Sequence, residues 1–226
     1  MFTHSTSFGN THEAVILLHG LARTKASMSK IESHLEKNGF MVVNMGYPSR
    51  KKPIEILSQT VIPAALKICK KNNADKIHFV THSMGGILVR YYLAHNTIAN
   101  LGRIVMLSPP NKGSEVVDKL KGLTLFKWLN GPAGLQLGTD PGSVPNQLGF
   151  PEYEVGVIAG DRSINPILSW LIPGIDDGKV SIERARLSGM KDFVIVHKSH
   201  PFIMNDPLVH RQIRTFILNG SFKSKY

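Results

Sequence analysis

Short apolar runs alternate with longer segments whose apolar residues recur at helical spacing over most of the chain. A strand inside a parallel sheet is apolar along its whole length, whereas a helix packed on that sheet is apolar along one face. The short runs therefore predict strands at Ala14–Leu18, Phe40–Met45, Lys76–Thr81, Arg103–Leu107, Glu154–Ala159 and Phe193–Val196. The longer segments predict helices at Thr24–Asn38, Ile54–Lys71, Met84–His95, Val180–Leu187 and Pro207–Leu218. This alternation is typical of an α/β fold with a mostly parallel sheet of about six strands flanked by helices.

The alternation stops between Asn111 and Pro151, where Gly and Pro are frequent around one short apolar piece, Leu120–Leu129. A segment of this kind within a regular fold is typical of an insertion over one end of the sheet. We therefore expect a single domain over residues 1–226, with a cap-like insertion at 111–151 after the strand that ends near Leu107.

The composition narrows the class of protein. Of 226 residues, 42% are apolar and 19% are charged, which supports a sizeable core and excludes disordered and coiled-coil classes. The single cysteine, Cys69, excludes an internal disulfide framework and a Cys-rich zinc site. No dinucleotide or phosphate-binding glycine loop follows the first strand, and no His, Asp or Glu group has metal-ligand spacing. We expect neither a cofactor nor a metal.

The charge balance favours anionic partners. The chain has 27 Lys and Arg against 16 Asp and Glu, a net charge of +11. The basic residues are dispersed and do not alternate with aromatic residues as in a nucleic-acid platform, so we expect no nucleic-acid partner and weak association with an anionic membrane surface. No apolar stretch approaches the ~20 residues of a membrane span. The N-terminal residues lack the pattern of a signal peptide, which predicts a cytoplasmic protein.

Chemistry in an open parallel sheet is expected where the strands end. The segment Val80–Gly86 joins a predicted strand to a predicted helix and places Ser83 on the turn between them. It resembles the nucleophile elbow of the α/β-hydrolase superfamily, usually G-x-S-x-G, with Thr81 in place of the first glycine and Gly85 matching the second. A serine that only caps the following helix is the alternative interpretation.

A nucleophilic serine needs a base, because its free hydroxyl is a weak nucleophile at neutral pH. The base is expected after the last strand, where His197 and His200 are the candidates. Family members carry it in the loop before the last helix, often followed by an apolar triplet, and Pro201-Phe202-Ile203 fits that pattern. The resemblance therefore implies His200, with His197 as the alternative. His82 is adjacent to Ser83 in sequence and is expected to point away from it.

An acid should orient that histidine, and it should follow the preceding strand. Asp161, Asp176 and Asp177 all satisfy this condition. Asp177-Gly178-Lys179-Val180 is similar to the D-G-x-V segment that carries the acid in many bacterial lipases, which implies Asp177. The order Ser83, Asp177, His200 along the chain is the order of this fold.

Two further features are expected around Ser83, and the first of them follows from the resemblance. His19-Gly20-Leu21 follows the first strand, where the family has a loop that donates a backbone N–H to the oxyanion, so the N–H groups of Leu21 and Met84 are the implied oxyanion hole. His19 itself is expected to be structural. The stretch from Leu120 to Gln147 matches no segment of the family. Its apolar residues either pack in the core or form a wall of the substrate pocket, through Leu123, Leu125, Phe126, Trp128 and Leu129, with Phe202 nearby.

The chain as a whole resembles the bacterial lipase and esterase branch of the superfamily, class 2-like lipases included. Leu107–Ser114 is similar to a T-P-x-x-G-S segment of that branch. The resemblance implies a serine hydrolase that cleaves a small-molecule or lipid ester, as a carboxylesterase or small lipase, through a Ser-His-Asp triad and an acyl-enzyme. A thioesterase or acyltransferase with the same triad is one alternative, and a non-catalytic ligand-binding protein of the same fold is another.

Overall fold

A parallel sheet of six strands runs through the molecule in the order β2-β1-β3-β4-β5-β6. The computed structural model describes residues 12–223, so most of the segment on which the signal-peptide prediction rests lies outside them. The strands are β1 (Glu13–Leu18), β2 (Met41–Met45), β3 (Lys76–His82), β4 (Leu101–Leu107), β5 (Val155–Gly160) and β6 (Asp192–Val196). All neighbouring strands pair in parallel. The predicted sheet is therefore confirmed, with small displacements at the strand ends.

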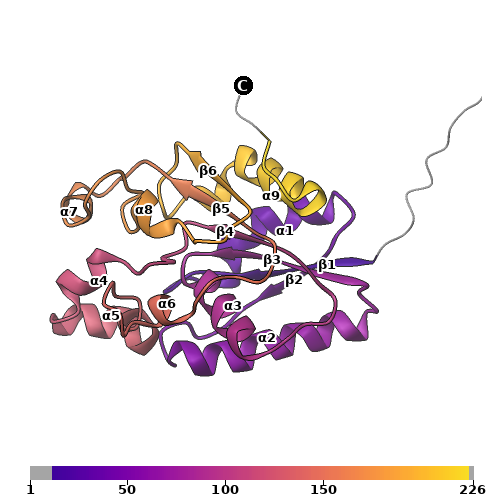
Figure 1. Ribbon diagram of the computed structural model, residues 1–226, viewed down its shortest axis with the longest axis horizontal. Helices are drawn as coiled ribbons and strands as arrows, with labels where there is room; N and C mark the ends of the chain where they lie inside the picture. The colour runs from indigo at the N-terminus through magenta and orange to yellow at the C-terminus, as the bar shows by residue number, and fades with distance from the viewer. Residues whose placement is uncertain (1–11, 224–226) are drawn as a thin grey trace, which may run out of the picture.

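Helices cover both faces of the sheet (Figure 1). On one face lie α1 (Ser29–Glu36) and α9 (Pro207–Asn219), and on the other lie α2 (Ile54–Lys71) and α3 (Met84–His95). The predicted helix at Thr24–Asn38 is shorter than expected, because its first turn is a 3₁₀ helix at Lys25–Met28. The one predicted at Val180–Leu187 is reduced to α8 (Ile182–Ala185), which the Ser181 side chain caps by accepting the N–H of Arg184.

The core explains why the strands are continuously apolar. In β1, Ala14, Ile16 and Leu18 pack against the layer of α2 and α3, whereas Val15 and Leu17 pack against the layer of α1 and α9. All five side chains are fully buried. A strand enclosed by helices on both sides has no solvent face, so period-two alternation is absent from its sequence.

The segment between β4 and β5 is more helical than the sequence predicts. It contains α4 (Glu115–Leu120), α5 (Thr124–Leu135) and α6 (Val144–Gln147), and α7 (Pro166–Trp170) follows β5. These helices gather at one end of the sheet (Figure 1). The backbone of α5 breaks at Gly131, which has φ 64° and ψ −173°. Within residues 12–223, no helix combines the length and apolar character that crossing a bilayer requires.

Candidate active site

Ser83 lies on the turn between β3 and α3 in a rare backbone conformation, with φ 53° and ψ −125°. Residues other than glycine seldom adopt positive φ, and such strain persists only where the surroundings hold it. Here the Ser83 N–H donates to the carbonyl of Leu107 at 2.8 Å, and the Ser83 carbonyl accepts the N–H of Gly86 at 3.0 Å. The turn places the Ser83 side chain in a cavity at the end of the sheet.

Two glycines allow the end of β1 to pack directly against this turn. A Cβ on Gly85 would lie 2.6 Å from the carbonyl oxygen of Leu18, and one on Gly20 would lie 2.8 Å from Nδ1 of His82. Thr81, which replaces the usual first glycine of the motif, is buried. Room for it comes from Gly86, where a Cβ would lie 3.3 Å from the Thr81 hydroxyl.

The structure brings Ser83, His200 and Asp177 into one hydrogen-bonded chain. Nε2 of His200 lies 3.1 Å from Oγ of Ser83, and Nδ1 of His200 lies 2.8 Å from Oδ2 of Asp177. The other carboxylate oxygen of Asp177 accepts the backbone N–H groups of Lys179 at 3.0 Å and Val180 at 2.9 Å. The N–H of His200 also donates to the Asp177 carbonyl at 2.9 Å. A carboxylate at Nδ1 favours the tautomer that leaves Nε2 free to accept the serine proton.

The alternative base and acids lie elsewhere. His197 and Asp161 pair with each other at 2.9 Å, and about two thirds of the His197 side chain (68%) is exposed. Asp176 accepts the Gly178 N–H at 2.6 Å and the hydroxyl of Ser169, so it organises its own loop. None of the three is hydrogen-bonded to Ser83 or His200.

The loop after β1 is held by His19. Its buried ring stacks on Tyr47, with the ring centroids 4.0 Å apart. Its Nδ1 lies 2.8 Å from the Gly20 carbonyl, and burial lowers the pKa of His19, so a neutral structural role fits. The N–H groups of Leu21 and Met84 have no hydrogen-bond acceptor among residues 12–223. Both donors therefore remain available beside Ser83.

A cavity of about 510 Å³ contains Ser83, His200 and Asp177 in its lining. Its apolar wall comes from α4, α5 and the segment around α7, through residues such as Val117, Phe126 and Leu168. Of the predicted pocket residues, Phe126 and Leu129 line the cavity. The lining does not include Leu123, Leu125, Trp128 or Phe202, which are all exposed. The reason is helical geometry, since α5 presents Phe126 and Leu129 to the cavity and Leu125 and Trp128 to solvent. Among the described residues, no group of three or more His, Cys, Asp or Glu side chains could hold a metal.

The sequence matches the family model of the alpha/beta hydrolase fold over residues 13–137. The chain belongs to the α/β-hydrolase fold family. Among curated proteins, none matches this α/β hydrolase.

Several solved structures share the fold of this α/β hydrolase. The mature lipase BlEst2 of Bacillus licheniformis has a TM-score of 0.72 at 19% identity, over 93% of this chain and 92% of the other. The metagenomic carboxyl esterase MGS0156 has a TM-score of 0.64 at 17% identity, over 84% and 65%. Phospholipase PlaB of Legionella pneumophila has a TM-score of 0.62 at 17% identity, over 77% and 45%. At these identities the likeness establishes the fold alone.

One residue beside the site of this α/β hydrolase has a contact that sequence reasoning missed. His82 is buried, and its Nε2 lies 3.0 Å from the backbone carbonyl of His200. Burial and the neighbouring His200 hold the pKa of His82 well below its ordinary value, so the neutral ring donates its Nε2–H to that carbonyl. The available signal was its position, the last residue of a buried strand and the one before Ser83.

Proposed function

We propose that this α/β hydrolase is a serine hydrolase that cleaves carboxylic esters, as a carboxylesterase or a small lipase. One observation carries the proposal: Asp177, His200 and Ser83 form a continuous hydrogen-bonded chain in the lining of a largely apolar cavity. An apolar cavity of about 510 Å³ accommodates the acyl chain of a small-molecule or lipid ester.

In the proposed reaction, Oγ of Ser83 attacks the ester carbonyl while Nε2 of His200 takes its proton. Asp177 holds the imidazole and stabilises the imidazolium that forms. The N–H groups of Leu21 and Met84 bind the oxyanion, and each such donor lowers the barrier by about 3 kcal/mol. The alcohol leaves with the proton from His200. Water, deprotonated by the same His200, then hydrolyses the acyl-enzyme and restores Ser83.

The test is hydrolysis of p-nitrophenyl esters from acetate to palmitate, together with labelling by a fluorophosphonate probe. We expect Ser83→Ala to lose hydrolysis by on the order of 10⁴-fold or more and to lose labelling entirely. Ser58→Ala is the matched control, because Ser58 is also buried but lies in α2 and donates to the Leu88 carbonyl. This control should retain both properties.

The outcomes separate the alternatives. Folded protein that neither hydrolyses an ester nor takes up the probe would be a ligand-binding protein, and the proposal would be wrong. Hydrolysis of acyl thioesters far above that of matched oxygen esters would assign a thioesterase that uses the same residues. The optimum acyl length distinguishes an esterase from a lipase.

A further inference from the structure

Three cationic residues line the same cavity as Ser83. They are Arg23, Arg50 and Lys179, from the loop after β1, the loop after β2 and the turn before α8. All three residues are exposed to solvent while they contribute to the cavity lining. The rest of the lining is largely apolar, and we refer to Arg23, Arg50 and Lys179 as the cationic rim of the cavity.

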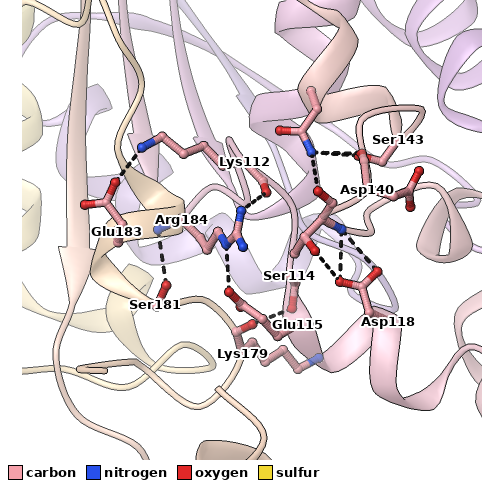
Figure 2. A network of polar contacts seen from close by, with 12 residues as sticks. Lys112, Ser114, Glu115, Asp118, Asp140, Ser143, Lys179, Ser181, Glu183 and Arg184 are labelled. Atoms are coloured by element: carbon pink, nitrogen blue, oxygen red, sulfur yellow. Dashed lines mark hydrogen bonds and ion pairs between the residues drawn. The ribbon is translucent and has the colours of Figure 1, made fainter. Parts of the chain in front are cut away.

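Two cations in the same polar network as Lys179 are paired with carboxylates. Lys112 pairs with Glu183 at 2.6 Å, and Arg184 pairs with Glu115 at 2.7 Å (Figure 2). Lys179 differs within the same network, because Figure 2 draws no contact to its ammonium. These two cations are thus paired with carboxylates, whereas Lys179 is in no ion pair of the described residues.

The rim cations have no ion-pair partner among residues 12–223. The guanidinium of Arg50 makes one long hydrogen bond, 3.4 Å to the carbonyl of Leu129. No hydrogen bond to the side chain of Arg23 or Lys179 is formed by the described residues. Unpaired lysines on open surface are common, but these three cations converge on one cavity.

The cavity has an excess of positive charge. Asp177 is the one carboxylate in its lining, and it is engaged by His200 and two backbone N–H groups. Although Lys179 is exposed as a residue, desolvation of its ammonium within the cavity lowers its pKa, repulsion by the Arg23 guanidinium adds to the effect, and the charge of Asp177 opposes it. The mutual repulsion of Arg23 and Lys179 is unfavourable for the folded protein. An anion between them would remove that repulsion.

We infer that the substrate is an acyl ester that also carries a phosphate group, held by Arg23, Arg50 and Lys179 while its ester carbonyl lies at Ser83. This inference rests on the proposed function and names its substrate class. Guanidinium groups bind phosphate oxygens through parallel hydrogen bonds, and a lysine adds a compact charge. Water adds across the acyl C–O bond, giving a carboxylic acid and an alcohol that keeps its phosphate.

The first experiment compares matched short-chain esters that stay monomeric. Dihexanoyl phosphatidic acid carries the phosphate, and dihexanoylglycerol lacks it. We expect kcat/KM to be about tenfold or more higher for the phosphatidic acid, the gain of one or two charge-assisted hydrogen bonds. The preference should shrink in about 0.5 M NaCl, because the rim is accessible to salt. Equal rates on the two esters would overturn the inference and leave the proposed function standing.

Variants test whether the preference arises at the rim. Lys179→Met and Arg23→Gln should each lower the ratio of the two kcat/KM values several-fold. Lys67→Gln is the control, because it removes one charge from an exposed position of α2 that does not line the cavity. This variant should leave the ratio unchanged. If all three variants lower it equally, the net charge of the protein causes the preference, and the inference is wrong.

A binding measurement keeps the two proposals distinguishable. Calorimetry of Ser83→Ala with octyl phosphate, and with octanol as the reference, does not depend on turnover. Binding of octyl phosphate that Lys179→Met weakens supports the cationic rim even if no ester is hydrolysed. Equal binding of octyl phosphate and octanol would overturn it. Vesicles of dioleoyl phosphatidylglycerol then separate the sources of the phosphate, since hydrolysis there indicates a lipid headgroup and hydrolysis of monomers alone indicates a soluble phosphate ester.

Discussion

At the scale of single residues, backbone strain gathers around the candidate active site. Four described residues other than glycine have positive φ: Ala22, Asn73, Ser83 and Ser108. Three of these, all but Asn73, lie just after the ends of β1, β3 and β4, where the cavity is. Each such residue costs on the order of 1–3 kcal/mol, so most of this strain in the described residues lies at the end of the sheet that holds the cavity.

His82 links the end of β3 to the candidate base His200. Its Nε2–H donates to the His200 carbonyl at 3.0 Å, and the two ring centroids are 4.8 Å apart. If His82 positions His200, then His82→Phe should lower kcat on a p-nitrophenyl ester by about tenfold to a hundredfold with little change in KM. Misplacing a catalytic group by about 1 Å has effects of that size. Steady-state kinetics and the rate of fluorophosphonate labelling measure it.

The matched control is His210→Phe. His210 is also buried, and its Nε2 lies 2.8 Å from the Met204 carbonyl, so both variants lose a buried histidine hydrogen bond to a backbone carbonyl. We expect similar losses of thermal stability and a loss of kcat in His82→Phe alone. Equal kcat values in the two variants would reduce His82 to a purely structural residue.

At the scale of elements, the sequence predicts the strands and long helices well, because burial on both faces leaves continuous apolar runs. The short helices around the cavity were missed for a local reason. Pro166 and Pro145 stand at the first turns of α7 and α6, and Pro132 lies beside the break in α5. Proline next to glycine suggests a loop, although proline is also favourable in a first helical turn.

Candidate site residues were predictable where a single segment carries the signal, as at Ser83 and His200. The cationic rim was not, because Arg23, Arg50 and Lys179 come from three separate segments and converge only in the folded chain. In the sequence they belong to a dispersed positive charge, which indicates a basic surface and nothing more specific.

The β3–β4 pair contains an irregularity that makes stability depend on pH. The register shifts between Ile77 and Phe79, and Nδ1 of His78 accepts the N–H of Arg103 at 2.9 Å in place of a ladder hydrogen bond. Gly102 permits this, since a Cβ there would lie 2.6 Å from the His78 ring. Protonation of Nδ1 of His78 would direct its new hydrogen at the hydrogen of the Arg103 N–H and break this contact. Burial lowers the pKa of His78 from 6.5 to about 4, although Glu13 opposes the shift.

The sign of the pH effect follows from that lowered pKa. Below pH 6.5 the unfolded chain protonates His78, whereas the folded protein does so only near pH 4. Stability is therefore full above pH 6.5 and falls toward pH 4, by up to about 3 kcal/mol from this residue. Urea unfolding across this range should show a flatter profile for His78→Gln than for the wild type. His95→Gln, which removes an exposed histidine from α3, should follow the wild type. A profile of His78→Gln parallel to the wild type would contradict this assignment.

At the scale of the whole molecule, apolar exposure and positive charge occur together. Leu125 and Trp128 of α5 are 66% and 74% exposed, and Ile167 and Trp170 of α7 are 76% and 86% exposed. Other residues of these two segments line the cavity, so the exposed side chains flank it. Aromatic side chains prefer the boundary between water and lipid, and a net charge of +11 attracts anionic headgroups. We therefore predict that this surface contacts a membrane with a negative surface charge.

The two tryptophans of the chain both lie on this surface, which makes intrinsic fluorescence a specific reporter. We expect vesicles that contain phosphatidylserine or cardiolipin to shift the emission of Trp128 and Trp170 to shorter wavelength, because each indole would leave water. Phosphatidylcholine vesicles should produce little shift, and about 0.5 M NaCl should reverse it by screening the attraction. Trp128→Phe and Trp170→Phe each leave one reporter and show whether α5 and α7 both enter the interface. Equal shifts with neutral and anionic vesicles would exclude the role of charge. Co-sedimentation with anionic vesicles without any shift would place the contact on a different face of the protein.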